Sequence, residues 1–216
     1  MKRKVNKIKM DLRAALEHDP AAKSALEIVL TYNGFHALVL YRVAHFFHVR
    51  GFRLLARMIS SVGRFFTGIE IHPGAKIGYG VFIDHGTGVV IGETTEIGNN
   101  VTIYQGATLG GTGKETGKRH PTLESGVMVS AGAKVLGPIT IGRNAKIGAG
   151  SVVLHDVPAN ATVVGVPGVV VKLNGERVDD LDQCLPDPIE DKICALEKRI
   201  QELEARLAEA ENKNNG

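Results

Sequence analysis

The fold of this chain is decided by the stretch Gly126-Val-Met-Val-Ser-Ala-Gly-Ala-Lys-Val-Leu-Gly-Pro-Ile-Thr-Ile-Gly-Arg-Asn-Ala-Lys-Ile-Gly-Ala-Gly-Ser-Val-Val153. Every sixth residue in it is aliphatic: Val129, Val135, Ile141, Ile147 and Val153. A period of six is neither the period of a helix nor a two-residue strand alternation, and it is typical of a parallel β-helix built from hexapeptide repeats. We therefore expect one short strand and one turn per six residues, with one aliphatic side chain of each unit in the shaft.

The same spacing continues toward the N-terminus, with one shift of two residues. It comprises Ile71, Ile77, Ile83 and Val89 before the shift, and Ile91, Ile97, Ile103 and Leu109 after it. A last shifted pair is formed by Val163 and Val169. The spacing predicts a mainly β domain, a parallel β-helix over residues 67–173.

The spacing is broken once, between Leu109 and Val129, by a polar, glycine-rich segment of residues 110–121, here named the excursion. The gap equals three hexads plus two residues, so we expect the segment to bulge out while the strand register recovers. A polar interruption of a regular repeat protein is a place to look for function.

The residues before the repeats are expected to be helical. Over residues 11–63 the apolar side chains recur with the period of a helix. Asp19-Pro20 is a good helix start, with Asp19 as the N-cap, and Asn33-Gly34 and Gly51 interrupt the pattern. We expect an N-terminal helical domain over residues 1–66.

A heptad pattern occupies the other end of the chain. Its a and d positions are apolar, at Ile189, Ile193, Leu196, Ile200, Leu203, Leu207 and Ala210. The g positions are basic and the following e positions acidic, which favours a parallel coiled coil; a helix folding back on its own chain is the alternative. We expect a linker and a coiled-coil helix over residues 174–216, and a parallel coil requires a rotationally symmetric oligomer.

Composition excludes several classes of protein. The hydrophobic content of 44% is too high for a disordered chain, and a net charge of +3 is too small to indicate nucleic-acid binding. The most apolar window, residues 35–52, contains Arg42 and Arg50 and is therefore not a membrane span. No apolar run follows the basic N-terminus, so we expect no signal peptide. Cys184 and Cys194 form neither a metal pair nor a disulfide framework, and we expect a cytoplasmic protein.

Two polar clusters near breaks in the repeat are candidates for chemistry. In Asp84-His85-Gly86 the turn could project the imidazole outward as a general base. Glu70, 15 residues earlier, could lie on the adjacent coil and orient it; a turn histidine is the alternative. On the excursion, Arg119 and His120 could capture a substrate carboxylate, since Arg offers bidentate geometry, or could belong to a solvated loop.

Several ordered motifs resemble bacterial serine O-acetyltransferases over about residues 11–172. They are Glu70-Ile-His-Pro-Gly-Ala-Lys-Ile-Gly, Asp84-His-Gly-Thr-Gly, Gly92-Glu-Thr, Gln105-Gly-Ala-Thr-Leu-Gly-Gly-Thr-Gly-Lys, Arg119-His-Pro and Gly148-Ala-Gly-Ser-Val-Val, with Asp19-Pro-Ala-Ala and Gly34-Phe-His-Ala-Leu in the helical part. The resemblance implies a left-handed parallel β-helix that assembles as a homotrimer, with active sites between neighbouring subunits. It also implies transfer of an acetyl group from acetyl-CoA to the hydroxyl of L-serine.

The resemblance also implies roles for individual residues. His85 stands at the family's general-base position, and Glu70 stands where the family commonly has the Asp that orients this base. Asp84 and Asp19 match positions on the ammonium and hydroxyl side of the amino acid, and Asp84 is grouped with the catalytic residues. The remaining matches are Arg119 and His120, which hold the serine carboxylate, and Gly111, Ala131 and Ala149, whose backbone lines the CoA groove.

The departures from the family pattern bear on partners. Only about 65 residues precede the repeats, which favours a trimer over the hexamer that longer members form. The chain ends in Asn214-Asn215-Gly216 where many members end in Ile, which argues against a complex with cysteine synthase. No metal is expected. Three alternatives stay open: an acetyltransferase for another small acceptor, a zinc enzyme of the γ-carbonic anhydrase kind using His72, His85 and His120, and a noncatalytic trimeric scaffold.

Overall fold

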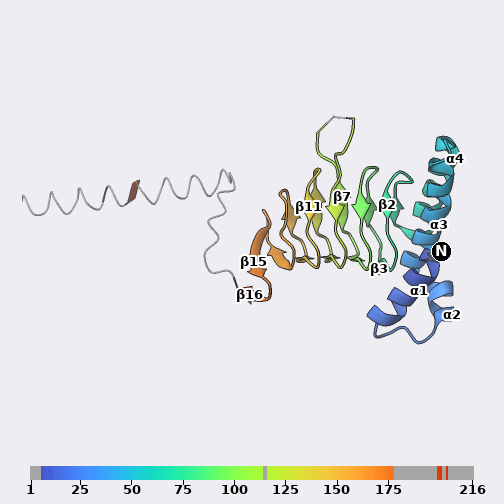
Figure 1. The fold of residues 1–216 in the computed structure, drawn as a ribbon, viewed down its shortest axis with the longest axis horizontal. Helices are drawn as coiled ribbons and strands as arrows, with labels where there is room; N and C mark the ends of the chain where they lie inside the picture. Colours follow the sequence, from blue (N-terminus) through green and yellow to red (C-terminus); the bar gives the residue numbers. More distant parts are fainter. Residues whose placement is uncertain (1–5, 114–115, 178–198, 201–202, 204–216) are drawn as a thin grey trace, which may run out of the picture. The chain divides into compact units, whose positions relative to one another are not determined.

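The computed structural model describes residues 6–113, 116–177, 199–200 and 203 (Figure 1). Helices come first, as predicted: α1 Lys7–His18, α2 Ala25–Thr31, α3 Asn33–His48 and α4 Arg53–Thr67. The break between α3 and α4 contains Gly51, whose φ of 88° lies in the left-handed region that favours glycine.

The helices are followed by short strands, most of them two or three residues long. They are β1 Glu70–Ile71, β2 Lys76–Ile77, β3 Phe82–Asp84, β4 Val90–Ile91, β5 Glu96–Ile97, β6 Thr102–Tyr104, β7 Thr108–Gly110, β8 Thr122–Leu123, β9 Met128–Val129, β10 Lys134–Leu136, β11 Thr140–Ile141, β12 Lys146–Ile147, β13 Val152–Val153, β14 Ala161–Val164, β15 Val169–Leu173 and β16 Glu176–Arg177.

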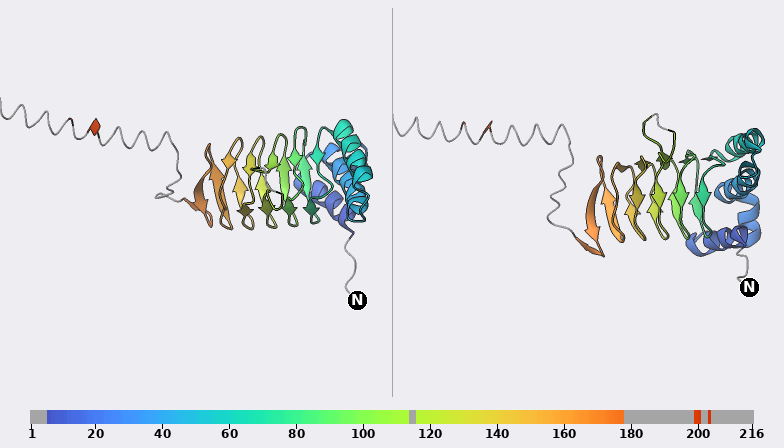
Figure 2. Two further views of the ribbon diagram at one scale, coloured as in Figure 1. Left: turned by 90° about the horizontal axis from the view of Figure 1, so that it is seen from above. Right: turned by 45° about the horizontal axis from the view of Figure 1, so that its top comes forward.

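These strands stack into three sheets that form the sides of a β-helix (Figure 2). The first sheet has the order β1-β4-β7-β10-β13, the second β11-β8-β5-β2, and the third β16-β15-β14-β12-β9-β6-β3. Strands of successive coils pair in parallel, so that Val90 lies opposite Thr108 and Lys134 opposite Val152. The predicted parallel β-helix of hexapeptide repeats is confirmed.

The shaft of the β-helix is filled by the aliphatic side chains that the six-residue spacing picked out. From Ile71 to Val153 each is at most 4% exposed, and Val163 is 1% exposed. Small residues such as Ala75, Ala107 and Ala133 occupy further inward positions and are fully buried. Removal of this apolar surface from water stabilises a stack whose coils are held together by strand hydrogen bonds.

Two coils are longer than the regular eighteen residues that separate Val90 from Thr108. Glu70 lies opposite Val90, twenty residues on, because the corner between β3 and β4 is two residues longer than a regular turn. Thr108 lies opposite Lys134, 26 residues on, because the excursion inserts eight residues. The shaft resumes at Leu123, one hexad earlier than the expected Val129.

Of the last predicted pair, Val163 is buried in the shaft as expected, but Val169 does not continue the parallel repeat. β15 pairs antiparallel with β14, so the chain reverses direction instead of completing another coil. Within this hairpin Val170 is buried, at 6% exposed, and lies opposite Val163. The inward position is therefore Val170 instead of the predicted Val169.

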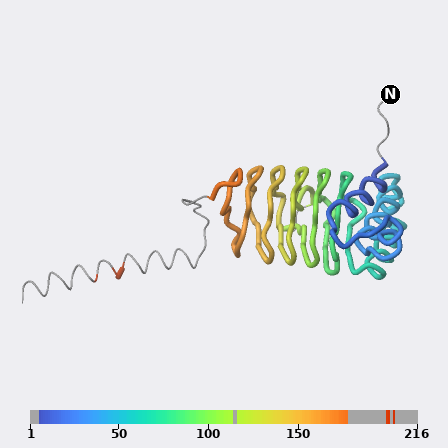
Figure 3. The backbone as a smooth tube through the Cα atoms, turned by 90° about the horizontal axis from the view of Figure 1, so that it is seen from below, coloured from blue at the N-terminus to red at the C-terminus, as the bar shows by residue number. Residues whose placement is uncertain are grey.

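The helices cover the first coil of the β-helix, as the backbone tube shows (Figure 3). The Tyr41 hydroxyl of α3 donates to the Ala75 carbonyl over 2.6 Å, and the Ser60 hydroxyl of α4 donates to the Ile71 carbonyl over 2.7 Å. Both acceptors are backbone groups of that first coil. The helices and the β-helix lie within one compact unit, Met1–Leu181.

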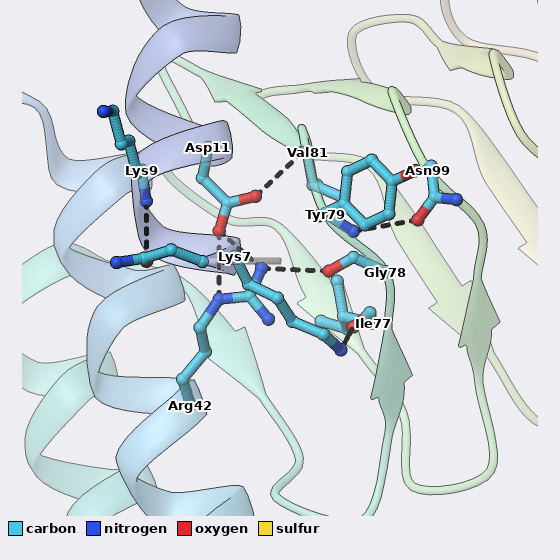
Figure 4. A network of polar contacts seen from close by, with 10 residues as sticks. Lys7, Lys9, Asp11, Arg42, Ile77, Gly78, Tyr79, Val81 and Asn99 are labelled. Carbon is cyan, nitrogen blue, oxygen red and sulfur yellow. Dashed lines mark hydrogen bonds and ion pairs between the residues drawn. The ribbon is translucent and has the colours of Figure 1, made fainter. Parts of the chain in front are cut away.

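A buried ion pair between α1 and α3 also makes hydrogen bonds to the backbone of the same coil (Figure 4). Asp11, whose side chain is 1% exposed, accepts from the Arg42 guanidinium of α3 and from the Val81 N–H over 3.1 Å. Arg42 also donates to the Gly78 carbonyl over 3.0 Å. Burial raises the pKa of Asp11 above its ordinary value, although Arg42 acts in the opposite direction. A buried ion pair loses the hydration of both charges, so its presence alone is weak evidence of added stability.

The segment predicted to form the coiled coil falls within a second compact unit, Asp182–Gly216. Of this segment only residues 199, 200 and 203 are described; they are helical, with Ile200 and Leu203 about half exposed. The remainder of the heptad prediction lies outside the described residues.

Candidate active site

The corner between β3 and β4, residues 85–88 and here named the His85 corner, projects an imidazole from the β-helix. His85 has a φ of 55° and its side chain is 77% exposed. Gly86 follows with a φ of 62°, and a Cβ there would lie 2.4 Å from Ile69. The left-handed turn thus points His85 outward, as the sequence predicted. Its Nε2 lies 4.0 Å from Oδ1 of Asp84.

A cavity of about 380 Å³ lies beside this corner. It is lined by Asp19, Ala21, Thr31, Tyr32, Asn33, Gly34, Ile83, Asp84 and His85. Gly34 lets α3 begin directly against β3, because a Cβ there would lie 2.0 Å from the Ile83 carbonyl oxygen. Three of the predicted site residues, Asp19, Asp84 and His85, therefore meet in one hollow.

Asp19 is the C-cap of α1, where its N–H donates to the Ala15 carbonyl, and not the predicted N-cap of the next helix, so that prediction is wrong. It follows the last residue of α1, and its carboxylate accepts from the Ala21 N–H over 2.8 Å in a local turn. The next helix, α2, begins at Ala25 with Ser24 as its N-cap, whose hydroxyl accepts from the Glu27 N–H. The carboxylate of Asp19 is consequently free to face the cavity.

Tyr32, which the sequence analysis did not identify, orients the Asp19 carboxylate and lowers its pKa. Its hydroxyl donates to Oδ2 of Asp19 over 2.5 Å. This hydrogen bond, followed by that of the Ala21 N–H, holds the pKa of Asp19 below its ordinary value. The same bond raises the pKa of Tyr32 to about 12. Asp19 is therefore an oriented anion at the mouth of the cavity.

A second corner of the β-helix carries Arg119 and His120. This Arg119 corner consists of residues 92–94, in the turn between β4 and β5, and residues 118–120, where the excursion returns. The Arg119 guanidinium donates to Glu93 over 3.2 Å. His120 is 7% exposed and packs on Gly92, where a Cβ would lie 1.9 Å from the ring. Burial, followed by the charge of Arg119, lowers the pKa of His120 below its ordinary value, which favours a neutral ring.

The predicted site residues thus divide between two corners of one chain. β4 separates the His85 corner from the Arg119 corner, since it connects residues 85–88 to residues 92–94. Gly111 lies at the Arg119 corner. A Cβ added to Gly111 would lie 3.1 Å from Nε2 of His120. His85 and Arg119, which the resemblance assigns to one substrate site, therefore lie at different corners of the same chain.

The other two positions predicted for the CoA groove continue the His85 corner along the stack. The backbone there is linked from coil to coil: the Gly106 N–H donates to Thr87, the Gly132 N–H to Gln105, and the Gly150 N–H to Ala131, each over 2.9 Å. Ala131 and Ala149 belong to the corners between the third and first sheets. Together with His85 they lie along one edge of the β-helix. An extended ligand could bind along such an edge.

Glu70 is not placed against His85 by the strand register. Its partner on the next coil is Val90, because the corner with His85 is two residues longer than a regular turn. The Glu70 carboxylate instead accepts from Arg64 of α4 over 3.2 Å, with side chains 34% and 60% exposed. The expected contact through adjacent coils is absent between these two described residues, and the orienting role of Glu70 stays a prediction.

His72 and His120 both lie between the first and second sheets, whereas His85 lies between the third and the first. Burial lowers the pKa of His72 below its ordinary value. Within the described residues, no three His, Cys, Asp or Glu side chains form a cluster that could hold a metal ion. None of the described helices is both long and apolar enough to cross a membrane.

Comparison with known proteins identifies the family. A model described as the N-terminal part of serine acetyltransferase matches residues 1–39, and a model of the bacterial transferase hexapeptide matches residues 120–155. A serine acetyltransferase of Bacillus subtilis (strain 168) is 59% identical over 210 residues, covering 96% of this chain and 97% of the relative. The chain belongs to the serine acetyltransferase family.

Solved serine acetyltransferases share the fold. The Neisseria gonorrhoeae serine acetyltransferase in complex with serine is 47% identical, with a TM-score of 0.74 over 76% of this chain and 67% of that chain. The soybean serine acetyltransferase complexed with serine is 50% identical, with a TM-score of 0.75 over 76% and 68%. The present serine acetyltransferase is thus an acyltransferase, and this assignment sets aside the zinc enzyme and the noncatalytic scaffold.

Proposed function

We propose that this serine acetyltransferase transfers the acetyl group of acetyl-CoA to the hydroxyl of L-serine at a site assembled from two copies of the chain. The observation that carries the proposal is the division between the two corners. The base candidate His85 and the oriented Asp19 lie at one corner, and the carboxylate-binding candidates Arg119 and His120 lie at the other. A site that needs both groups is completed by the Arg119 corner of a neighbouring copy.

In the proposed reaction His85 acts as the general base. A serine hydroxyl is a weak nucleophile until a neutral imidazole takes its proton as the oxygen attacks the thioester carbonyl. The C–O bond forms, the C–S bond breaks, and the proton held by His85 passes to the departing CoA thiolate. The exposed position of the ring lets it reach a substrate bound outside the β-helix.

Charge complementarity supports an amino acid as the acceptor. Asp19 and Asp84 present carboxylates to the cavity at the His85 corner and would hold an ammonium group. Arg119 presents a guanidinium that fits a carboxylate in two-point geometry. An acceptor with both charges and a hydroxyl between them matches L-serine, which favours it over a sugar or another small alcohol.

Acetyl-CoA would lie along the edge that contains Ala131 and Ala149. Small residues at these corners let backbone groups approach an extended ligand closely. Backbone N–H groups of such a wall would also stabilise the oxyanion that develops during attack. The carboxylate that orients His85 is proposed to be Glu70, rotated away from Arg64, with Asp84 on the substrate side.

The assembly is proposed to be a homotrimer, since closed rotational symmetry places the His85 corner of each subunit beside the Arg119 corner of the next. We propose that it acts in the cytoplasm. Release of CoA thiol from acetyl-CoA, measured with L-serine against other hydroxyl acceptors and with or without a chelator, tests the reaction. Serine-dependent release that survives chelation is expected, and its absence overturns the proposal.

Subunit complementation tests the shared site. His85→Ala and Arg119→Ala chains are each expected to be nearly inactive as pure assemblies. Co-expressed, they form mixed assemblies in which some interfaces carry His85 from one chain and Arg119 from its neighbour, so part of the activity returns. If both residues served the same site within one chain, the mixture would stay inactive.

A further inference from the structure

Thr94, in the turn between β4 and β5, makes hydrogen bonds to most of the returning end of the excursion at the Arg119 corner. Its hydroxyl oxygen accepts from two backbone groups, the Arg119 N–H and the His120 N–H, each over 3.1 Å. The same oxygen lies 2.9 Å from Nδ1 of His120. Its carbonyl accepts from the Lys118 ammonium over 2.8 Å. One threonine thereby contacts three successive residues at the returning end of the excursion.

The hydrogen bonds of the Thr94 hydroxyl determine whether Nδ1 of His120 donates or accepts. A threonine hydroxyl has one hydrogen to donate and two lone pairs that accept. The N–H groups of Arg119 and His120 occupy both lone pairs. The hydrogen must therefore be donated to Nδ1 of His120, which makes Nδ1 an acceptor.

The backbone of Thr94 leads to the same assignment. Its N–H donates to Nδ1 of His120 over 3.3 Å, so two donors converge on this nitrogen. A proton on Nδ1 would face both. The ring is consequently the neutral tautomer with its proton on Nε2, and among the described residues nothing accepts from that N–H. Nε2 of His120 is left as a donor for a ligand.

We propose that Thr94 is a positioning residue that holds His120 in its Nε2–H tautomer and fixes the backbone of Arg119, so that both donors are presented to the carboxylate of the acceptor amino acid. This inference deepens the proposed function and rests on it. Thr94 itself touches no reacting atom, and its effect is transmitted through the two residues after Lys118.

The neighbouring residue Thr95 provides a matched control. It is 1% exposed, and its hydroxyl is buried without a hydrogen-bond partner. Thr94→Val and Thr95→Val make the same isosteric change one residue apart, at positions that differ in whether the hydroxyl is used. Thr94→Ser keeps the hydroxyl and is the conservative rescue.

Steady-state kinetics with the full-length enzyme give the first readout. In Thr94→Val we expect KM for L-serine to rise roughly tenfold or more, the effect of losing hydrogen bonds to a charged ligand, with KM for acetyl-CoA within about twofold of the parent. Thr94→Ser should restore most of the serine affinity, and Thr95→Val should match the parent. An unchanged KM for serine in Thr94→Val overturns the inference.

Nitrogen NMR of histidine-labelled enzyme gives a readout that does not depend on turnover. His120→Asn identifies the His120 signals. The parent and Thr95→Val should show an unprotonated Nδ1 and a protonated Nε2. Thr94→Val keeps only the longer backbone donor to Nδ1, at 3.3 Å, and should show a mixture of tautomers. An unchanged Nε2–H signature in Thr94→Val refutes the positioning role even if the variant is inactive.

Arg119→Ala separates this inference from the proposed function. If Arg119→Ala leaves KM for serine unchanged, the corner does not bind the acceptor and the proposed function fails there. If Arg119→Ala raises that KM while Thr94→Val does not, the proposed function stands and the role of Thr94 is wrong.

Discussion

The hydroxyl of Tyr32 donates a 2.5 Å hydrogen bond to Oδ2 of Asp19, joining the start of α3 to the turn after α1. Oδ1 of the same carboxylate is held by the Ala21 N–H. Both oxygens are thus oriented by the chain itself before any ligand binds, and such preorganisation lowers the ordering cost of recognition.

Removing the Tyr32 hydroxyl should weaken acceptor binding selectively. In Tyr32→Phe we expect KM for L-serine to rise about three- to tenfold, because a hydrogen bond to a charged group is lost at a partly solvated site, with kcat and KM for acetyl-CoA little changed. Tyr79→Phe is the control, since the Tyr79 phenol makes no hydrogen bond within the described residues. Equal serine kinetics in the two variants would contradict the role of Tyr32.

Gly92→Ala should displace the His120 ring. The new Cβ would lie 1.9 Å from Cδ2 and 2.0 Å from Nε2 of His120, so the buried ring must move. We expect kcat/KM for serine to fall at least tenfold, since small misplacements at a site have such effects. Gly63→Ala is the control, because its Cβ meets Leu40 at an ordinary 3.6 Å. A crystal structure of Gly92→Ala with His120 unmoved would refute this explanation.

Stability should fall as the solution is acidified below about pH 6.5. The folded-state pKa values of His72 and His120 are depressed, chiefly by burial. The unfolded chain therefore takes up protons that the folded chain does not, and the free energy of unfolding decreases as pH falls from 6.5 through those folded pKa values. His120→Asn should reduce the loss of thermal midpoint between pH 7.5 and 5. An equal loss in both proteins would exclude His120 as a contributor.

Removing one member of the buried pair of Asp11 and Arg42 should lower the free energy of unfolding more than replacing both members with apolar residues. Asp11→Ala leaves the guanidinium of Arg42 buried without its carboxylate, which costs about 3–5 kcal/mol. Replacing both by Leu and Met should recover much of this loss, because neither desolvated charge remains. Thermal unfolding of the two single variants and the double variant measures the coupling. Additive losses would show that the two side chains do not act as a pair.

Glu70 can be tested apart from its present partner. Arg64→Gln should change the free energy of unfolding by less than about 1 kcal/mol, because the pair is largely exposed, and should leave kcat intact. Glu70→Gln should lower kcat about ten- to a hundredfold if this carboxylate orients His85. If Asp84→Asn produces that loss of kcat and Glu70→Gln does not, the orienting carboxylate is Asp84.

The repeat could be predicted because the inward residues of a hexad follow one another at fixed spacing, so Val135 and Ile141 carry their signal locally. The longer corner beside His85 is visible in the sequence as the two-residue shift between Val89 and Ile91, but the expectation for Glu70 was based on a regular coil, and its partner is Val90 instead. Asp19 was misread because the same carboxylate serves a helix cap or a local turn equally well. Tyr32 escaped notice because its contact with Asp19 exists only once α1 and α3 have packed.

The antiparallel hairpin of β14 and β15 has a consequence for association. A stack of parallel coils ends in a row of unpaired backbone groups, which invites another chain to add strands and grow a fibre. Here the chain turns back on that row, and the outermost described strand is β16, only Glu176 and Arg177, both exposed and oppositely charged. The helices cover the first coil and the hairpin covers the last one, so both ends of the described stack are protected against end-to-end polymerisation.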